Sequence, residues 1–225
     1  MLTMVEVDPA DPAFDNPTKP IGPVYSSSEA RALAVERGWR FRADGLSMRR
    51  VVASPLPQRI FGIEPILWCL ERGAVVICAG GGGIPTIHTR ERAWAGRRLT
   101  GIEAVIDKDL ASAVLAADLC ADALLILTDV DAVYADWGTP HQSAIRHATP
   151  ANLVHAEFAA GSMGPKVTAA CNFVRRGGSL AAIGSVDDAE ALLSGDAGTL
   201  ITADAGAGPL AGGTPGAARS DGARG

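Results

Sequence analysis

Aromatic residues and cysteines are scarce in this sequence, and no apolar run is long enough to cross a bilayer. Aromatic residues make up 5% of the 225 residues, whereas glycine occurs 26 times, so we expect small side chains to pack helices closely against a sheet. The four cysteines form no C-x-x-C pair and lie in apolar surroundings, as expected of buried thiols in a reducing compartment. Because the first residues also lack a signal-peptide pattern, we expect a cytoplasmic protein with no membrane partner.

An excess of positive charge is missing too. Lysine and arginine number 20 against 25 for aspartate and glutamate, and the net charge of −5 argues against a general nucleic-acid binder. Hydrophobic residues at 48% and charged residues at 20% are ordinary values for a globular protein. A length of 225 residues suits one sizeable α/β domain, or a core domain with a small appendage.

The most informative stretch is the apolar run Ala74–Ala79 with the four glycines that follow it, Gly80–Gly83. A continuous apolar run predicts a strand buried on both faces, as in a parallel sheet. Glycines at the end of such a strand let backbone N–H groups approach an anion closely, because no β-carbon intervenes. The run matches neither G-x-G-x-x-G nor G-x-x-x-x-G-K-S/T, and a flexible turn is the alternative interpretation.

We expect residues 1–58 to form a protruding, lid-like subdomain. Met1–Pro23 is crowded with prolines and shows no core element. Ser28 is a suitable N-cap for a short helix that stops at Gly38. The alternating pattern that follows, in residues 39–42 and 50–53, predicts a small hairpin or two edge strands.

Residues 59–202 predict an α/β core that contains the nucleotide-binding half of the chain. Strands are expected at residues 74–79, 123–128 and 180–184, and helices at 60–72, after Asp107, after Pro165 and at 186–193. Residues 85–100 are too polar for the core and predict a loop or lid. Residues 203–225 are rich in glycine and alanine without periodicity, which predicts a disordered tail.

Two lysines stand where helices are expected to begin, Lys108 after Asp107 and Lys166 after Pro165. The helix macrodipole disfavours an exposed cation at this end by about 0.3–1 kcal/mol. Two such placements indicate an anion between them, since a helix N-terminus with a lysine is a good receptor for phosphate. Asp109 can hold both ammonium groups in place. The alternative for each lysine, and for Lys19 on its proline-rich loop, is a side chain that lies in solvent.

Five segments, in order along the chain, closely resemble the motifs of carbamate kinases, which belong to the amino acid kinase superfamily. They are residues 17–23 (PTKPIGP), 79–85 (AGGGGIP), 104–112 (AVIDKDLAS), 127–134 (LTDVDAVY) and 161–167 (GSMGPKV). The resemblance implies a three-layer αβα sandwich with a mainly parallel central sheet, and a homodimer. It also implies Mg²⁺ with ATP or ADP, and reversible phosphoryl transfer between ADP and carbamoyl phosphate in arginine and carbamoyl phosphate catabolism.

The resemblance implies roles for single residues as well. Lys108 and Lys166 would neutralise the phosphoryl group in transfer, with Asp109 organising them, and Lys19 would reach it from the lid. The loop that holds the carbamate end would comprise Gly80, Gly81, Gly82, Gly83, Ile84 and Pro85. The nucleotide pocket would be lined by Thr128, Asp129, Val130, Asp131, Tyr134, Met163 and Gly164. No protein metal ligand is implied, and carbamate, already an anionic nucleophile, needs no general base.

One part of the carbamate kinase pattern has no match here. The family carries, ahead of the lid motif, a first strand with a Gly-Gly-Asn phosphate-binding loop, whereas Met1 opens just before that motif. We therefore expect an N-terminally incomplete form of the fold, without appreciable activity from residues 1–225 alone. The alternatives are a non-catalytic fragment that binds nucleotide or a partner, and another amino acid kinase that acts on an N-acylated glutamate or aspartate. The Pro-Thr-Lys-Pro-Ile-Gly motif favours a carbamate kinase over the latter.

Overall fold

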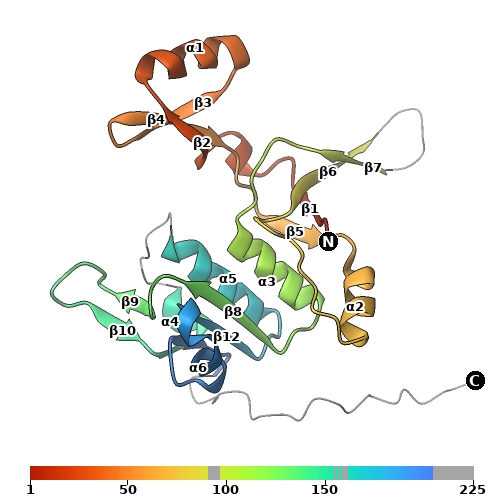
Figure 1. Ribbon diagram of the computed structural model, residues 1–225, viewed down its shortest axis with the longest axis vertical. Coiled ribbons are helices and arrows are strands. Elements are labelled where there is room, and N and C mark those ends of the chain that lie inside the picture. The colour runs from red at the N-terminus through yellow and green to blue at the C-terminus, as the bar shows by residue number, and fades with distance from the viewer. Residues whose placement is uncertain (91–96, 155, 157, 159–161, 205–225) are drawn as a thin grey trace, which may run out of the picture.

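The computed structural model describes residues 1–90, 97–154, 156, 158 and 162–204, and Figure 1 shows how they are arranged. A lid of strands and one helix stands at one end, next to a four-stranded sheet, and a second four-stranded sheet with its helices forms the other end. From residue 205 on, the predicted disordered tail lies outside the described residues. None of the described helices is long and apolar enough to cross a membrane.

The lid consists of a three-stranded antiparallel sheet and helix α1 (Ser27–Arg37). Its strands lie in the order β2-β4-β3, with β2 (Lys19–Tyr25), β3 (Arg40–Asp44) and β4 (Ser47–Val52). α1 begins with a capping box, in which Ser26 and Glu29 bond each other's backbone N–H. The hydroxyl of Ser26 also donates to the Glu29 carboxylate, and this bond, with the one from the Ser26 N–H, lowers the pKa of Glu29. The helix and the hairpin lie where the sequence predicts them, although the N-cap is Ser26 rather than Ser28.

The first core sheet has the order β5-β1-β6-β7, with β1 (Met4–Val7), β5 (Pro57–Ile60), β6 (Ile84–Arg90) and β7 (Arg97–Gly101). The expectation that residues 1–23 hold no core element is wrong, because Val5 and Val7 of β1 are fully buried. The expectation of a loop or lid at residues 85–100 is wrong for β6 and β7. Thr86 shows the reason: its hydroxyl donates to the carbonyl of Val5 at 3.0 Å, so a polar side chain is satisfied inside the sheet.

The run Ala74–Ala79 is not a strand, contrary to the sequence-based prediction. Val75 is 94% exposed and Ile77 is 82% exposed, and no ladder joins this segment to a strand of the described residues. It is held at single points instead: the N-terminal amino group donates to the carbonyl of Ile77 at 2.5 Å, and the N–H of Ala79 donates to Thr3 Oγ1 at 2.9 Å. The place beside β1 is taken by β6, and an apolar run without a neighbouring strand stays irregular.

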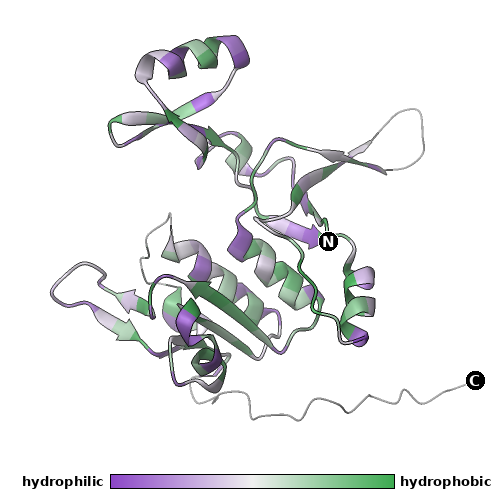
Figure 2. Ribbon diagram, viewed as in Figure 1, coloured by the Kyte–Doolittle hydropathy of each residue, from purple (hydrophilic) through white to green (hydrophobic). Residues whose placement is uncertain are grey.

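The second core sheet has the order β11-β13-β12-β8, with β8 (Ala123–Thr128), β11 (His147–Ala148), β12 (Leu180–Ser185) and β13 (Thr199–Ile201). Figure 2 shows hydrophobic residues along β8 and β12. Helices α3 (Lys108–Asp118) and α5 (Met163–Arg175) pack on one face, where Ile183 joins the buried cluster that contains Phe173. The next residue, Gly184, faces Leu192 of α6 (Ala189–Ser194) on the other side.

Helices on both faces of this sheet make three αβα layers, so the predicted fold class is confirmed. The sheets are mixed rather than mainly parallel, since three of their ladders are parallel and three are antiparallel among the described strands. Two of the antiparallel pairs, β1 with β5 and β12 with β13, are joined by connections that contain other elements, so a local residue pattern does not reveal their pairing.

The remaining elements connect these layers. They are η1 (Pro12–Phe14), α2 (Ile63–Glu71), β9 (Val133–Ala135), β10 (Ser143–Ile145), α4 (Pro150–Leu153) and η2 (Val186–Asp188). The predicted helix at 60–72 is shorter at its start, because Ile60 belongs to β5. The four cysteines are free thiols, but only Cys171 is buried, and burial raises the pKa of its thiol.

Candidate active site

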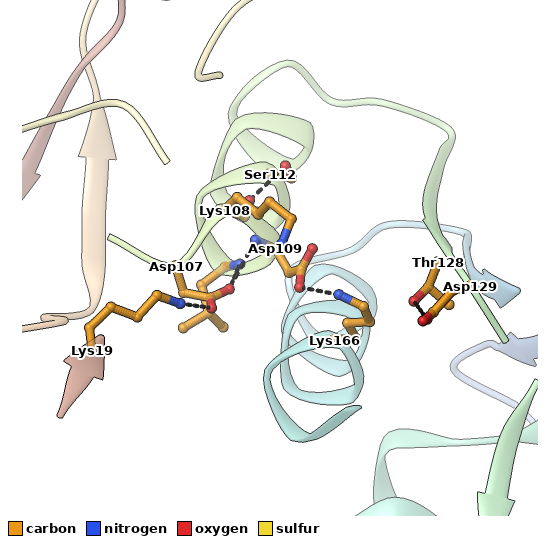
Figure 3. Close-up of polar contacts among 9 residues, drawn as sticks. Lys19, Asp107, Lys108, Asp109, Ser112, Thr128, Asp129 and Lys166 are labelled. Atoms are coloured by element: carbon orange, nitrogen blue, oxygen red, sulfur yellow. Dashed lines mark hydrogen bonds and ion pairs between the residues drawn. The ribbon is translucent and has the colours of Figure 1, made fainter. Parts of the chain in front are cut away.

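The start of α3 is the centre of the site. Asp107 is the N-cap residue, and its carboxylate accepts the backbone N–H groups of Asp109 at 3.0 Å and Leu110 at 3.4 Å. Lys19, at the start of β2 in the lid, donates to the same carboxylate at 3.1 Å (Figure 3). Burial raises the pKa of Asp107, but the hydrogen bond and charge of Lys19, with the two N–H groups, outweigh it and leave this pKa below its ordinary value.

The first turn of α5 reaches the same place. Lys166 donates to Asp109 at 2.8 Å, and the two side chains are only 12% and 11% exposed. Figure 3 shows this ion pair crossing from α5 to α3, beside the pair made by Lys19 and Asp107. Two lysines that are 147 positions apart in the chain are therefore anchored on two carboxylates of one helical turn.

Lys108 completes the set from the exposed side of α3, and its ammonium makes no ion pair with the described residues. Lys19, Lys108 and Lys166 are all the lysines of the chain, whose other basic residues are 17 arginines out of 20. Three ammonium groups against the carboxylates of Asp107 and Asp109 leave one positive charge in excess. That excess lies at two helix N-termini, and within the described part of the chain Ser162 makes no side-chain N-cap bond to α5.

The glycine loop touches the start of α3. A β-carbon on Gly82 would lie 2.2 Å from the carbonyl oxygen of Ile106, and one on Gly83 would lie 2.4 Å from Val5 Cγ2. These two glycines thus let the loop pack against α3 and β1, which side chains would prevent. Gly80 and Gly81 are exposed, with open space where a side chain would point. Ile84 and Pro85 begin β6.

A cavity of about 230 Å³ opens on the other side of Lys166, beyond the end of β8. Five of the predicted nucleotide-pocket residues line it: Thr128, Asp129, Val130, Tyr134 and Met163. Gly164 and Asp131 are not among its lining residues, although Asp131 accepts the hydroxyl of Tyr134 at 2.8 Å. That hydrogen bond is the main reason why the pKa of Tyr134 is raised.

Sequence reasoning missed four residues that also line the cavity: Ala132, Trp137, Phe158 and Ser162. Trp137 lies 5.3 Å from Tyr134, ring centre to ring centre, in an edge-to-face arrangement, and it is 62% exposed. A tryptophan three residues after Tyr134 in a polar turn was a usable signal. Phe158 carried none, because only the folding of the chain past α4 brings it to the cavity.

Residues 29–185 match the model of the amino acid kinase family, a span of well over half the chain. The chain belongs to the amino acid kinase family. Within this family it is 55% identical to the carbamate kinase of Rhizobium meliloti (strain 1021) over 202 residues, which are 90% of this chain and 61% of that protein. It is also 55% identical to the carbamate kinase of Haemophilus influenzae, over 90% of this chain and 64% of that one.

A solved member of the family has the same architecture. The structure of carbamate kinase from Giardia lamblia bound to AMP-PNP is 39% identical and superposes with a TM-score of 0.78, over 90% of this chain and 64% of that one. The chain thus spans somewhat less than two thirds of the length of these three relatives.

Proposed function

We propose that the protein is a carbamate kinase, which transfers a phosphoryl group reversibly between ATP and carbamate in the catabolism of arginine and carbamoyl phosphate. The observation that carries this proposal is the convergence of all three lysines on the start of α3, next to a glycine loop and a cavity. A phosphoryl group in transfer spreads negative charge over its oxygens, and fixed ammonium groups with helix N-termini stabilise that charge.

We infer that the two substrates bind on the two sides of Lys166. The nucleotide is placed in the cavity, where Tyr134 and Trp137 offer aromatic surface to a base. The relative from Giardia lamblia was solved bound to AMP-PNP, which supports nucleotide binding by this chain. The carbamate end is placed at Gly80 and Gly81, whose exposed backbone can receive a small planar anion.

Mg²⁺ is expected to arrive with the nucleotide. No cluster of three carboxylate, thiol or imidazole groups that could hold a metal occurs in the described part of the chain. Asp129 is the carboxylate that lines the cavity, and one carboxylate with substrate phosphates is a usual environment for Mg²⁺. The ion would supply further neutralisation of the phosphate charge.

The chemistry needs no acid or base from the protein. In the ATP-forming direction an oxygen of the β-phosphate of ADP attacks the phosphorus of carbamoyl phosphate, the bond from phosphorus to the carbamate oxygen breaks, and carbamate leaves with that electron pair. The entering oxygen is already anionic, and the leaving oxygen departs as the stable carbamate anion, so neither needs a proton transfer. Catalysis therefore reduces to positioning and charge neutralisation, to which Lys19, Lys108 and Lys166 contribute from the protein.

The test is a coupled assay of ATP formation from Mg–ADP and carbamoyl phosphate, made with the protein as its own cell produces it. We expect turnover that is lost in Lys108→Met and kept in Arg31→Met, which removes an exposed positive charge from the lid helix. Transfer from ATP to an N-acylated glutamate or to aspartate, without transfer to carbamate, would assign another amino acid kinase activity. Nucleotide binding without any transfer would assign a non-catalytic role.

A homodimer through α2 is the second part of the proposal. α2 buries only Ile66, while Trp68 is 56% exposed and Leu70 is 43% exposed. Glu64 and Arg72 lie four residues before and four residues after Trp68, on the same side of the helix. Two copies of α2 that cross antiparallel at Trp68 would therefore place each Glu64 opposite the partner's Arg72, so a two-fold axis would form this charge pair twice.

A further inference from the structure

Two arginines of β3 hold the segment that leads to Lys19. Arg40 donates from Nη1 to the carbonyl of Asp15 at 2.6 Å, and Arg42 donates from Nε to the carbonyl of Pro17 at 3.0 Å. A second nitrogen of Arg42, Nη2, donates to Oδ1 of Asn16. Three successive residues, 15 to 17, are thus bound by two side chains that lie on one face of the lid sheet, since they are two positions apart in a strand.

These bonds act where the chain enters and leaves the lid, at residues 15–18 and Val52, which we call the root of the lid. The chain enters the lid through residues 15–18 and leaves it after Val52, which pairs with Lys19 across β2 and β4. β3 lies on the far side of β4 from β2, so no backbone ladder connects β3 to the entering segment. The arginine side chains supply that connection, and they couple the distal strand to the backbone two residues before Lys19.

The lid rests on one short stretch of the core, just ahead of α3. Lys19 pairs with Asp107, Arg50 pairs with Glu103, and the N–H of Val105 donates to the carbonyl of Ala53 at 2.9 Å. All three contacts lie within residues 103–107, so a small rotation of the lid about its root would move the ammonium group of Lys19 along α3. What fixes the root therefore fixes the place of Lys19.

We propose that Arg42, with Arg40, is a positioning residue for Lys19: the two guanidinium groups hold residues 15–17 against β3, so that the lid and its lysine move as one body. Arginine suits this task because its planar guanidinium presents donors from separate nitrogens in a fixed geometry, whereas a lysine offers all its donors from one nitrogen on a flexible stem. The proposal rests on the proposed function for the role of Lys19 at the phosphate. Its structural part, the dependence of the Lys19–Asp107 pair on Arg42, stands on the contacts alone.

The test compares Arg42→Met with the native chain by NMR, without substrate. With only three lysines in the chain, selective ¹⁵N-lysine labelling resolves the Lys19 ammonium, and ¹³C labelling follows the titration of the Asp107 carboxyl group. We expect Arg42→Met to move the Asp107 titration toward the ordinary value of 3.8 and to alter the Lys19 signal. Arg42→Lys, which keeps one donor nitrogen, should give an Asp107 titration between those of the native chain and Arg42→Met. In the assay, Arg42→Met should lower kcat by up to about 100-fold while the KM for ADP stays unchanged.

The matched control is Arg31→Met, because among the described residues Arg31 bonds within α1, to the carbonyl of Ser27. An Asp107 titration identical in Arg42→Met and in the native chain, with the Trp39 indole signal showing an intact lid, would overturn the proposal. If Arg42→Met does not fold, Asn16→Ala and Arg40→Met each remove one of the hydrogen bonds between β3 and residues 15–17. Each must shift the Asp107 titration in the same direction, and no shift in either variant also overturns the proposal. Absence of carbamate kinase turnover would refute the proposed function. The Asp107 titration would still show whether the Lys19–Asp107 pair depends on Arg42.

Discussion

Lys166 and Asp109 are 12% and 11% exposed, so replacing either one alone leaves a charge away from water without its partner. We predict that Lys166→Met lowers the free energy of unfolding by about 3 kcal/mol, and that adding Asp109→Leu restores most of the loss. Neither variant should form ATP. Urea unfolding of the single and double variants measures the coupling between the two side chains.

Lys108 is the control at the same scale, because it is exposed and makes no ion pair with the described residues. Lys108→Met should change the free energy of unfolding by less than about 0.5 kcal/mol and still abolish turnover. If Lys166→Met proved as stable as Lys108→Met, the buried pair would have no structural role.

Acid should weaken the hold of the lid on α3. The pKa of Asp107 is lower in the folded protein than its ordinary value of 3.8, so the stabilisation by this carboxylate is fully present above about pH 4. It is lost as the pH falls through the folded-state pKa, because protonation removes the charge that Lys19 meets. Asp107→Asn keeps an N-cap residue but removes this charge. Unfolding free energies measured from pH 6 to pH 2 should therefore fall less steeply in Asp107→Asn than in the native chain; equal slopes would contradict the assignment.

At the scale of elements, the glycine loop offers a matched pair of variants. Gly82 has a φ of 126°, and a β-carbon there would lie 2.2 Å from the carbonyl oxygen of Ile106, whereas Gly81 has open space around it. Gly82→Ala must displace the loop or the start of α3, and we predict a loss of stability of at least about 2 kcal/mol. Gly81→Ala should stay within about 0.5 kcal/mol of the native chain. Thermal unfolding separates the two, and equal melting temperatures would show that α3 tolerates the shift.

At the scale of the whole molecule, the prediction concerns the assembly. Glu64→Arg or Arg72→Glu alone places like charges opposite each other in the proposed α2 pair and should shift the protein toward monomer. The double exchange, Glu64→Arg with Arg72→Glu, should restore the dimer because the pairing is reversed but complementary. Light scattering at several concentrations gives the mass.

Leu46→Ser is the control for this assembly, since Leu46 is fully exposed in the turn between β3 and β4, and the lid and α2 lie well apart in the molecule (Figure 1). It should leave the mass unchanged. A native monomer at all concentrations, or a dimer that ignores both single charge reversals, would remove α2 as the interface.

Part of the molecule follows from the sequence by itself. The capped helices α1 and α3 and the strand β8 lie where local patterns place them, because N-caps, helix-stopping glycines and apolar runs act over a few residues. The motif resemblance and the family match point to the same fold. The lysines at helix starts indicated an anion site, because a cation at that end of a helix needs a compensating negative group.

Only the tertiary structure decided the rest. It brought Lys19 and Lys166 to two carboxylates of one turn, although the two lysines lie in different elements. It also placed Val5 in a core strand and left Val75 exposed, where the residue pattern predicted the reverse. The physical reason is the same in both cases: ion pairs and strand ladders join residues far apart in the chain, and whether a neighbour is present depends on the whole fold and not on the segment that needs it.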